Sequence, residues 1–442
     1  MTENINQYPN RRLGLALYTA LGLLASPALI PRLLLRHRPL SRALAGVRER
    51  MGRLPPGLPQ GGIWVHAASA GEARAALALS RALDSAWPGT PVLHSCLTPS
   101  GHQVLSAAGR PVLYFPLDLP GPTRRALERL KPRLVLLVET EMWPRFLDTC
   151  RLRGIPAAVV SGRISPGRLR GYLRAAPLLR SSLEALRMCC VQAPEEAERF
   201  ASLGIPRDRL RVTGNLKFDI SPPEENEEIA SPYRTHEGDL VLVAGSTREG
   251  EEEAVCVAFQ ALREHRPRSL LILVPRHPQR AAHALGTALR TLGPRSARLR
   301  SVLPPGGRPP DCSCVVVDRM GELAALYRLA SIAFVGGSLV PAGGHTPIEP
   351  AACGIPILFG PHMEHVREVS RALIDAGGAV QVSGAQDLRR QILALAGDAA
   401  QRARMGRNAR QLVETHRGAA RRTVEALMDL ESMRPPRTAA RS

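Results

Sequence analysis

Glu72 is the first side chain of the sequence that could move a proton during a reaction. It follows a run of small residues, Ala67 to Gly71, directly after an apolar stretch. Small residues let the backbone turn tightly into a helix, and a carboxylate in the first helical turn is stabilised by free N–H groups and the helix dipole. With an ordinary pKa of ~4.3, Glu72 would be ionised at neutral pH and could accept a proton from a hydroxyl group. This position is equally consistent with a residue that stabilises the start of a helix and has no catalytic role.

Two further carboxylates, Glu139 and Glu141, follow the apolar run LVLLV at residues 134–138. If this run is a parallel strand, both lie at its carboxyl end, where α/β sheets bind their ligands. Residues two apart share one side of an extended chain and take opposite sides where the chain turns. We therefore expect one carboxylate to face a substrate and the other to anchor the turn.

Arg276 stands where it could bind an anion. It directly follows the apolar run LLILVP at residues 270–275. A guanidinium at the end of a strand can donate two parallel hydrogen bonds to a phosphate, and it stays charged at physiological pH. The competing interpretation is a surface salt bridge.

The segment 334–361 is rich in glycine and reads FVGGSLVPAGGHTPIEPAACGIPILFGP. The glycines that allow close approach of the backbone are Gly336, Gly337, Gly343 and Gly344. A helix beginning near Pro347 and Glu349 would offer free N–H groups to an anion, and Glu349 would suit ribose hydroxyls. The spacing is neither a GxGxxG fingerprint nor a Walker loop. The segment therefore predicts an anion or nucleotide site without identifying the ligand.

Short apolar runs alternate with helix-length segments on both sides of a polar stretch. The runs of the first series are 63–68, 92–97, 112–115, 134–139, 157–161 and 189–192. Those of the second are 240–245, 270–274, 315–317, 332–336, 355–359 and 379–382. Runs that are apolar on both faces predict parallel strands covered by helices. We expect two doubly wound, Rossmann-like α/β domains facing a cleft.

Composition places the boundaries between these domains. Residues 223–238 lie in a stretch with prolines, an acidic cluster and few aliphatic residues, which is typical of a linker. The expected first domain is 51–222 and the second 239–434. Residues 435–442, rich in Arg and Ala, form an expected disordered tail.

The charge of the chain favours anionic partners. Lys and Arg number 59 and Asp and Glu 39, which gives a formal net charge of +20. Such an excess suits anionic membranes or phosphorylated ligands. Aromatic residues are only 4%, and none interleave with basic residues as a nucleic-acid stacking platform would, so we expect no nucleic-acid partner. The eight cysteines contain no CxxC pair, which favours a reduced compartment and no zinc site.

Residues 1–50 are expected to form a membrane anchor with a basic flank. The stretch 13–31 contains no charged residue. Its length is near the lower limit for crossing about 30 Å of hydrocarbon. Arginines flank it at Arg11, Arg12, Arg32, Arg36 and Arg38. Such a flank predicts that the following domains stay on the cytoplasmic side. A cleaved signal peptide is the alternative.

In its ordered motifs the chain resembles the 3-deoxy-D-manno-octulosonic acid (Kdo) transferases, inverting glycosyltransferases of the GT-B fold with an N-terminal membrane anchor. The motifs are IWVHAASAGE, TPSG, YFPLD, ETEMWP, SGRIS, TGNLKFD, AGSTREGEE, PRHPQR, MGEL, GGSLVPAGGHTPIEP and GPH. Each is weak alone, but their common order from about residue 11 to about residue 370 makes coincidence implausible.

The resemblance implies roles for individual residues. The family's base falls on Glu72, and the groups that steady its transition state fall on Glu141, less surely Glu139, and on Lys217. The implied contacts to the CMP moiety are Pro275, Arg276, Met320, Gly321, Glu322, Thr346, Pro347, Ile348 and Glu349. The chain departs from the family at three places. Thr346 stands where Asn is usual, Arg248 where His is usual, and His365-Val366 where Asn-Phe is usual.

The implied reaction moves Kdo from CMP-Kdo to a lipid A precursor (lipid IVA) in lipopolysaccharide core biosynthesis, with inversion and without a metal or cofactor. Glu72 would take the proton of a glucosamine 6′-hydroxyl as that oxygen attacks the anomeric carbon. The expected location is the cytoplasmic face of the inner (plasma) membrane, in contact with anionic lipids. Two alternatives stay open. One is another GT-B enzyme, a UDP-GlcNAc transferase or 2-epimerase type, and the other is a non-catalytic membrane-associated nucleotide-sugar binder.

Overall fold

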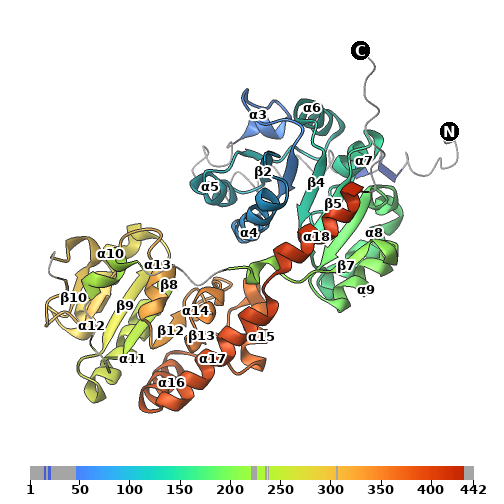
Figure 1. The fold of residues 1–442 in the computed structure, drawn as a ribbon. Helices are drawn as coiled ribbons and strands as arrows, with labels where there is room; N and C mark the ends of the chain where they lie inside the picture. The colour runs from blue at the N-terminus through green and yellow to red at the C-terminus, as the bar shows by residue number, and fades with distance from the viewer. Residues whose placement is uncertain are drawn as a thin grey trace. The chain divides into compact units, whose positions relative to one another are not determined.

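The computed structural model describes residues 14–15, 18–20, 46–220, 226–233, 236, 238–304 and 307–432 (Figure 1). These residues form two compact units. The first runs to Asp219 and also includes the chain from Arg417 onward, whereas the second runs from Ile220 to His416. Each unit contains a seven-stranded, fully parallel sheet, so the expectation of two parallel α/β domains is confirmed.

The sheet of the first unit has the order β3-β2-β1-β4-β5-β6-β7. Its strands are β1 Ile63–His66, β2 Val92–Cys96, β3 Val112–Tyr114, β4 Leu134–Val138, β5 Ala157–Gly162, β6 Leu186–Val191 and β7 Leu210–Val212. Its helices are α3 Val47–Arg50, α4 Ala70–Ala86, α5 Pro99–Ala107, α6 Pro120–Leu130, α7 Pro144–Leu152, α8 Pro166–Leu183, α9 Pro194–Ser202 and α18 Ala419–Ser432, with short 3-10 turns η1 Arg207–Arg209 and η2 Leu216–Phe218. Proline at the first helical position starts α5, α6, α7 and α9, because its fixed φ suits a helix and its missing N–H is not needed there.

Helices cover both faces of this sheet, so its central strands are apolar on both sides. Trp64 packs in a cluster with Phe146 of α7, and its neighbour Val65 packs in another with Leu79 of α4. Alternate residues of a strand point to opposite faces, so these two clusters lie on opposite sides of the sheet. This double burial is the reason that β1 and β4 read as continuous apolar runs.

Helix α18 corrects the predicted end of the second domain. The expected domain 239–434 includes α18, but this helix packs against α4 and β6 of the first unit. Its Val424 and Leu427 join the core beside Leu79. The carboxylate of Asp219 accepts hydrogen bonds from the N–H groups that begin α18, including that of Ala419 at 3.2 Å. The apolar face of α18 was visible in the sequence, but its partner was not.

The sheet of the second unit has the order β10-β11-β9-β8-β12-β13-β14. Its strands are β8 Val241–Thr247, β9 Leu270–Pro275, β10 Ala297–Leu299, β11 Cys314–Val316, β12 Ile332–Val335, β13 Ile357–Phe359 and β14 Ala379–Gln381. Its helices are α10 Glu227–Ala230, α11 Glu251–His265, α12 Ala281–Leu292, α13 Leu323–Leu326, α14 Ile348–Ala352, α15 Arg367–Asp375, α16 Ala385–Gly397 and α17 Ala399–His416. Short 3-10 turns are η3 Ser231–Tyr233, η4 Pro278–Arg280, η5 Arg300–Val302, η6 Tyr327–Leu329 and η7 Glu364–Val366.

The predicted linker 223–238 also needs correction. Its described residues include α10 and η3, and Tyr233 is fully buried in the core beside Val241 and Val243. Polar composition suggested a free connection, but the buried ring of Tyr233, the packing of Ile229 and hydrogen bonds from Arg300 and Arg308 join this segment to the second unit. The chain passes between the units near residues 219–220 and 416–417 instead.

The expected anchor lies largely outside the described residues. Of the uncharged stretch 13–31, the structure describes only residues 14, 15 and 18–20. Within the described parts of the chain, no helix combines the length and the apolar character that crossing a bilayer requires.

Candidate functional site

Each sheet has one point where the strand order changes direction. In the first unit this point lies between β1 and β4, and in the second between β8 and β12. Parallel α/β sheets bind ligands outside the carboxyl ends of the strands at such a point. The first point brings Glu72, which follows β1, close to Glu139 and Glu141, which follow β4. The second brings the end of β8 beside the glycine-rich segment that follows β12.

Glu72 lies in the first turn of α4 and folds back on the residues that precede it. Ser69 is the N-cap of α4, and its hydroxyl donates to Oε1 of Glu72 at 2.9 Å. The backbone N–H of Ala68 donates to Oε2 of Glu72 at 2.8 Å. This arrangement resembles a capping box, in which the cap hydroxyl accepts the N–H of the third helical residue and the carboxylate of that residue accepts a backbone N–H at the start of the helix. The helix-start role is thus real, and it holds the carboxylate in one orientation.

The surroundings of Glu72 also suit a general base. Burial, and after it the charges of Glu139 and Glu141, raise the pKa of Glu72 to about 7, against the hydrogen bonds from Ala68 and Ser69, which lower it. The influence of both carboxylates shows that the three acids lie near one another. A base is most effective when its pKa is near the working pH, so this environment supports proton abstraction at neutral pH.

The structure brings Lys217 to Glu139. The ammonium of Lys217, on η2, forms an ion pair with Oε1 of Glu139, and both side chains are about four-fifths buried. The backbone of η2 is held from two sides. Asn215 accepts the N–H of Lys217 at 2.9 Å, and the hydroxyl of Ser161 accepts that of Leu216 at 3.3 Å. Between the two acids of the ETE motif, Glu139 is therefore the one that Lys217 anchors.

Glu141 lies above a buried histidine. Its Oε2 is 4.0 Å from Nε2 of His66, whose side chain is completely buried and stacks on Phe115. Burial lowers the pKa of His66 to about 3, so His66 is neutral at pH 7. Burial, and then the charge of Glu139, raise the pKa of Glu141. Sequence reasoning did not single out His66, although its place as the last residue of β1 was a signal.

Unusual backbone conformations occur near the points where the strand order of each sheet changes direction. Among the described residues, four other than glycine have positive φ, and three of them, Glu139, Ser161 and Ser246, lie at or just beyond the carboxyl ends of β4, β5 and β8. Such conformations cost energy and tend to concentrate where function requires them. In the second unit, the close approach of the end of β8 explains why residue 336 is a glycine. A Cβ on Gly336 would lie 2.6 Å from Cα of Thr247, so a larger residue does not fit.

The residues of the second unit that are predicted to contact the CMP moiety follow neighbouring strands. Pro275 ends β9, and the N–H of Arg276 donates to the carbonyl oxygen of Thr247, at the end of β8, at 3.0 Å. The triad Met320, Gly321 and Glu322 follows β11. Because β11, β9, β8 and β12 are adjacent in that order, all these segments meet at one edge of the sheet.

The three consecutive residues 320–322 differ in the exposure of their side chains. The side chain of Met320 is 69% exposed, whereas that of Glu322 is buried and lies 3.4 Å from Nε of Arg300. Gly321 between them has a φ of 92°, which favours glycine. The carboxylate of Glu322 is therefore engaged within the unit, and the backbone of this turn and Met320 are left facing outward.

The segment 346–349 forms the start of α14. Pro347 is its N-cap, and the hydroxyl of Thr346 accepts the N–H of Ile348 at 3.4 Å. The predicted helix start is confirmed, but α14 has only five residues. Glu349 is half-buried, and its charge adds to burial in raising the pKa of Tyr327.

One departure from the family pattern, His365, packs against the glycine-rich segment. The ring of His365 lies against Gly343, the first of the two glycines that precede His345. A Cβ on Gly343 would be 2.3 Å from Cε1 of His365, and one on Gly344 would be 2.5 Å from the sulfur of Met363. Both glycines have positive φ. His365 therefore helps to set the path of the backbone into α14.

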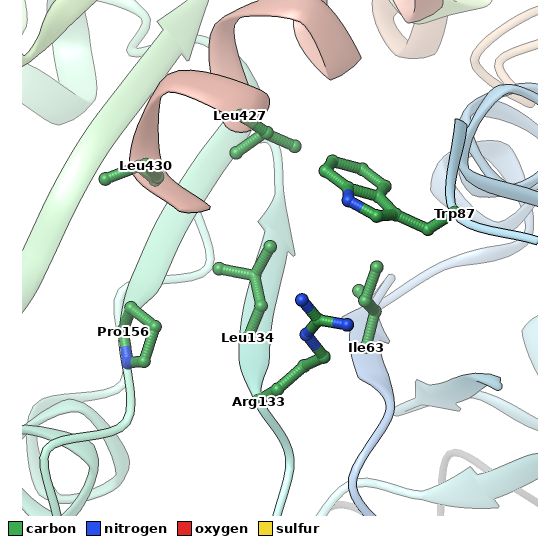
Figure 2. A pocket seen from close by; sticks show the side chains of 7 residues that line it. All are labelled: Ile63, Trp87, Arg133, Leu134, Pro156, Leu427 and Leu430. Carbon is green, nitrogen blue, oxygen red and sulfur yellow. The ribbon is translucent and has the colours of Figure 1, made fainter. Parts of the chain in front are cut away.

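A pocket in the first unit lies far from these acids. It is apolar, and Figure 2 shows Trp87 and Leu427 pointing toward one another beside Ile63 and Leu134. Ile63 and Leu134 are the first residues of β1 and β4, at the opposite end of the strands from Glu72. Because Leu427 and Leu430 belong to α18, this pocket lies where α18 packs against the first unit.

Comparison with known proteins identifies the sequence family. Residues 45–220 match the family model described as 3-deoxy-D-manno-octulosonic-acid transferase (kdotransferase). The chain is 38% identical to the 3-deoxy-D-manno-octulosonic acid transferase of Bordetella pertussis over 394 residues, which cover 86% of this chain and 90% of that protein. It is 32% identical to the enzyme of the same name from Haemophilus influenzae over 421 residues, covering 93% and 97%.

Solved structures add information about the fold alone. The UDP-GlcNAc 2-epimerase of Neisseria meningitidis, bound to UDP-GlcNAc, is 14% identical, with a TM-score of 0.55 over 83% of this chain and 100% of that chain. A putative UDP-N-acetylglucosamine 2-epimerase from Listeria monocytogenes is 13% identical, with a TM-score of 0.55 over 85% and 98%. These likenesses establish the GT-B-like pair of parallel α/β units. Sequence identity over most of both chains shows that this protein belongs to the 3-deoxy-D-manno-octulosonic acid transferase family.

Proposed function

We propose that this enzyme transfers Kdo from CMP-Kdo to a lipid A precursor, lipid IVA, in lipopolysaccharide biosynthesis. Family membership supports Kdo transfer. The observation that carries the proposal within the structure is the grouping of Glu72, Glu139, Glu141 and Lys217 at the switch point of the first sheet. An enzyme that deprotonates a sugar hydroxyl needs such a base, and a simple binding protein does not.

In the proposed reaction, Glu72 accepts the proton of a glucosamine 6′-hydroxyl as that oxygen attacks the anomeric carbon of Kdo. The bond from this carbon to the CMP phosphate breaks, and attack from the opposite face inverts the centre. Its raised pKa lets Glu72 hold the proton at neutral pH once it has accepted it. Lys217, held by Glu139, supplies a fixed positive charge near the reacting groups.

The second unit takes the donor in this proposal. Arg276 would contact the CMP phosphate, and the backbone of residues 320–322 and 346–349 would contact the nucleoside. The adjacency of the preceding strands supports this assignment, since it gathers these segments at one sheet edge. As CMP leaves, its phosphate gains negative charge, and the guanidinium of Arg276 would stabilise this charge by donating two parallel hydrogen bonds.

We also propose that the N-terminal segment attaches the enzyme to the cytoplasmic face of the inner membrane, in contact with anionic lipids. The uncharged stretch 13–31 and its arginine flanks support this. Two of the few described residues of this stretch, Leu15 and Thr19, contact the first unit. Arg145 donates to the carbonyl oxygen of Leu15 at 2.8 Å and to the hydroxyl of Thr19 at 2.6 Å, and Leu15 is buried.

The deciding experiment measures CMP release from CMP-Kdo by the purified full-length protein, with and without lipid IVA in detergent. We expect CMP release that depends on lipid IVA, together with a Kdo-modified lipid in the mass spectrum. A non-catalytic binder would bind CMP-Kdo without releasing CMP. A UDP-GlcNAc enzyme would instead convert UDP-GlcNAc and ignore CMP-Kdo. Either of these two outcomes contradicts the proposal.

A further inference from the structure

Glu251 is a fully buried carboxylate that accepts four backbone hydrogen bonds. Its Oε2 accepts the N–H of Arg248 at 2.8 Å and that of Gly337 at 2.7 Å. Its Oε1 accepts the N–H of Ser338 at 2.9 Å and that of Leu339 at 2.8 Å. A buried charge is tolerated only when such donors replace its water, and here they do.

Three of these donors form an anion-binding loop. Successive N–H groups that converge on one point, often after a residue with left-handed backbone, make a nest that binds anions. Gly337, with a φ of 67°, begins such a run in residues 337–339. The glycine-rich segment was expected to offer its backbone to a ligand anion. In residues 337–339 that anion is the protein's own Glu251.

The bonds of Glu251 connect the segments that carry the proposed donor contacts. The carbonyl oxygen of Gly337 accepts the N–H of Gly344 at 2.7 Å, and Gly344 lies two positions before the segment 346–349. On the other side, Glu251 holds the N–H of Arg248, and the adjacent Thr247 accepts the N–H of Arg276. One carboxylate thereby links the end of β8, the loop after β12 and the approach to α14.

We propose that Glu251 is a positioning residue for the donor site, acting as an internal anion that fixes the loop 336–345 against the end of β8. This inference rests on the proposed function of the second unit as the CMP-Kdo site. A first-turn acid of α11 could instead serve the helix dipole alone. That role would not require contact with residues 86 to 88 positions away in the chain.

The test compares Glu251→Gln with Glu253→Gln by titration calorimetry with CMP. Glu253 is exposed in the same first turn of α11, so its variant removes the same charge from the same helix end. Glutamine turns an NH₂ group toward backbone donors and leaves at least one of them unsatisfied. We expect Glu251→Gln to bind CMP at least about tenfold more weakly, in line with the penalty for one buried unpaired group, and Glu253→Gln to bind it normally.

Chemical rescue distinguishes positioning from simple loss of folding. Glu251→Ala opens a space beside four free donors, so formate or acetate should restore CMP affinity, whereas acetamide should not. Hydrogen exchange of residues 337–339 should be fast in this variant and slow again with formate. If Glu251→Gln does not fold, the rescue of Glu251→Ala carries the test, and failure of rescue overturns the proposal.

Two other outcomes have separate meanings. CMP affinity within twofold of wild type in folded Glu251→Gln overturns the positioning role and leaves the proposed function standing. A wild-type protein that does not bind CMP removes the proposed donor site and, with it, the role of Glu251.

Discussion

Lys217 and Glu139 form an ion pair, and the charge of Glu139 raises the pKa of Glu72, the proposed base. Glu139 adopts a φ of 60°, an uncommon backbone conformation for a residue other than glycine. The pair thus holds a strained residue directly after β4 and leaves Glu141 as the acid above His66. The family resemblance weighted Glu141 above Glu139, whereas the geometry gives Glu139 the direct link to Lys217.

Replacing Glu72 by Gln should lower turnover by about two to four orders of magnitude, the usual range for a general base, with little change in CMP affinity. Gln keeps the size of the side chain but cannot accept the proton. Steady-state kinetics with CMP-Kdo and lipid IVA provide the measurement. Turnover near that of wild type would show that Glu72 only starts α4.

The stability of the same variant separates the two roles further. The pKa of Glu72 is raised from 4.5 to about 7 in the fold, so its contribution to stability is present below pH ~4.5 and is lost as the pH rises through 7. A neutral Gln avoids burying a charge at pH 8. We therefore expect the thermal midpoint of Glu72→Gln at pH 8 to be no lower than that of wild type. A marked decrease would indicate that capping by the carboxylate dominates.

Arg276→Ala should raise the KM for CMP-Kdo by about ten- to a hundredfold, because it removes a hydrogen bond between charged groups. Arg276→Lys should recover part of the loss, since an ammonium keeps the charge without the paired geometry. Arg371→Ala is a suitable control, because Arg371 is exposed on α15 and pairs with Asp375 four residues along the same helix. Unchanged donor kinetics in Arg276→Ala would assign this arginine a surface role.

Most of the fold followed from the pattern of the sequence. Apolar runs predicted the long central strands because both faces of each sheet are buried. Two short strands were not predicted. β7 is an edge strand with exposed residues, and β10 is a three-residue edge strand with only Ala297 fully buried. Such strands lack the apolar run that marks a strand buried on both faces.

Contacts between distant parts of the chain could not be predicted from the sequence pattern. The acids at 72, 139 and 141 were found because each follows a recognisable strand. Glu251 was not singled out, because a first-turn acid of a helix looks the same whether it bonds locally or to a loop 86 residues away. The same is true of α18, whose apolar face gave no indication of which core it would join.

Deleting residues 1–38 should leave two folded units but weaken membrane association. The deletion removes the uncharged stretch 13–31 and the contacts of Arg145 with Leu15 and Thr19. Membrane pelleting in high salt is the measurement, because salt screens attraction between the basic chain and anionic lipids. A truncated protein that still pellets fully in high salt would rule out an anchor in residues 1–38.

The most specific prediction concerns the effect of Glu139 on the pH dependence of the reaction. As a base, Glu72 must be deprotonated, so kcat/KM should rise with pH through about 7. The charge of Glu139 raises the pKa of Glu72, and its loss also leaves Lys217 unpaired nearby. Both effects favour the carboxylate, so Glu139→Gln should move this rise to lower pH, even where the maximal rate falls. Glu128→Gln, which breaks an exposed pair with Arg153, should leave it in place. An unshifted profile for Glu139→Gln would contradict the coupling between these two acids.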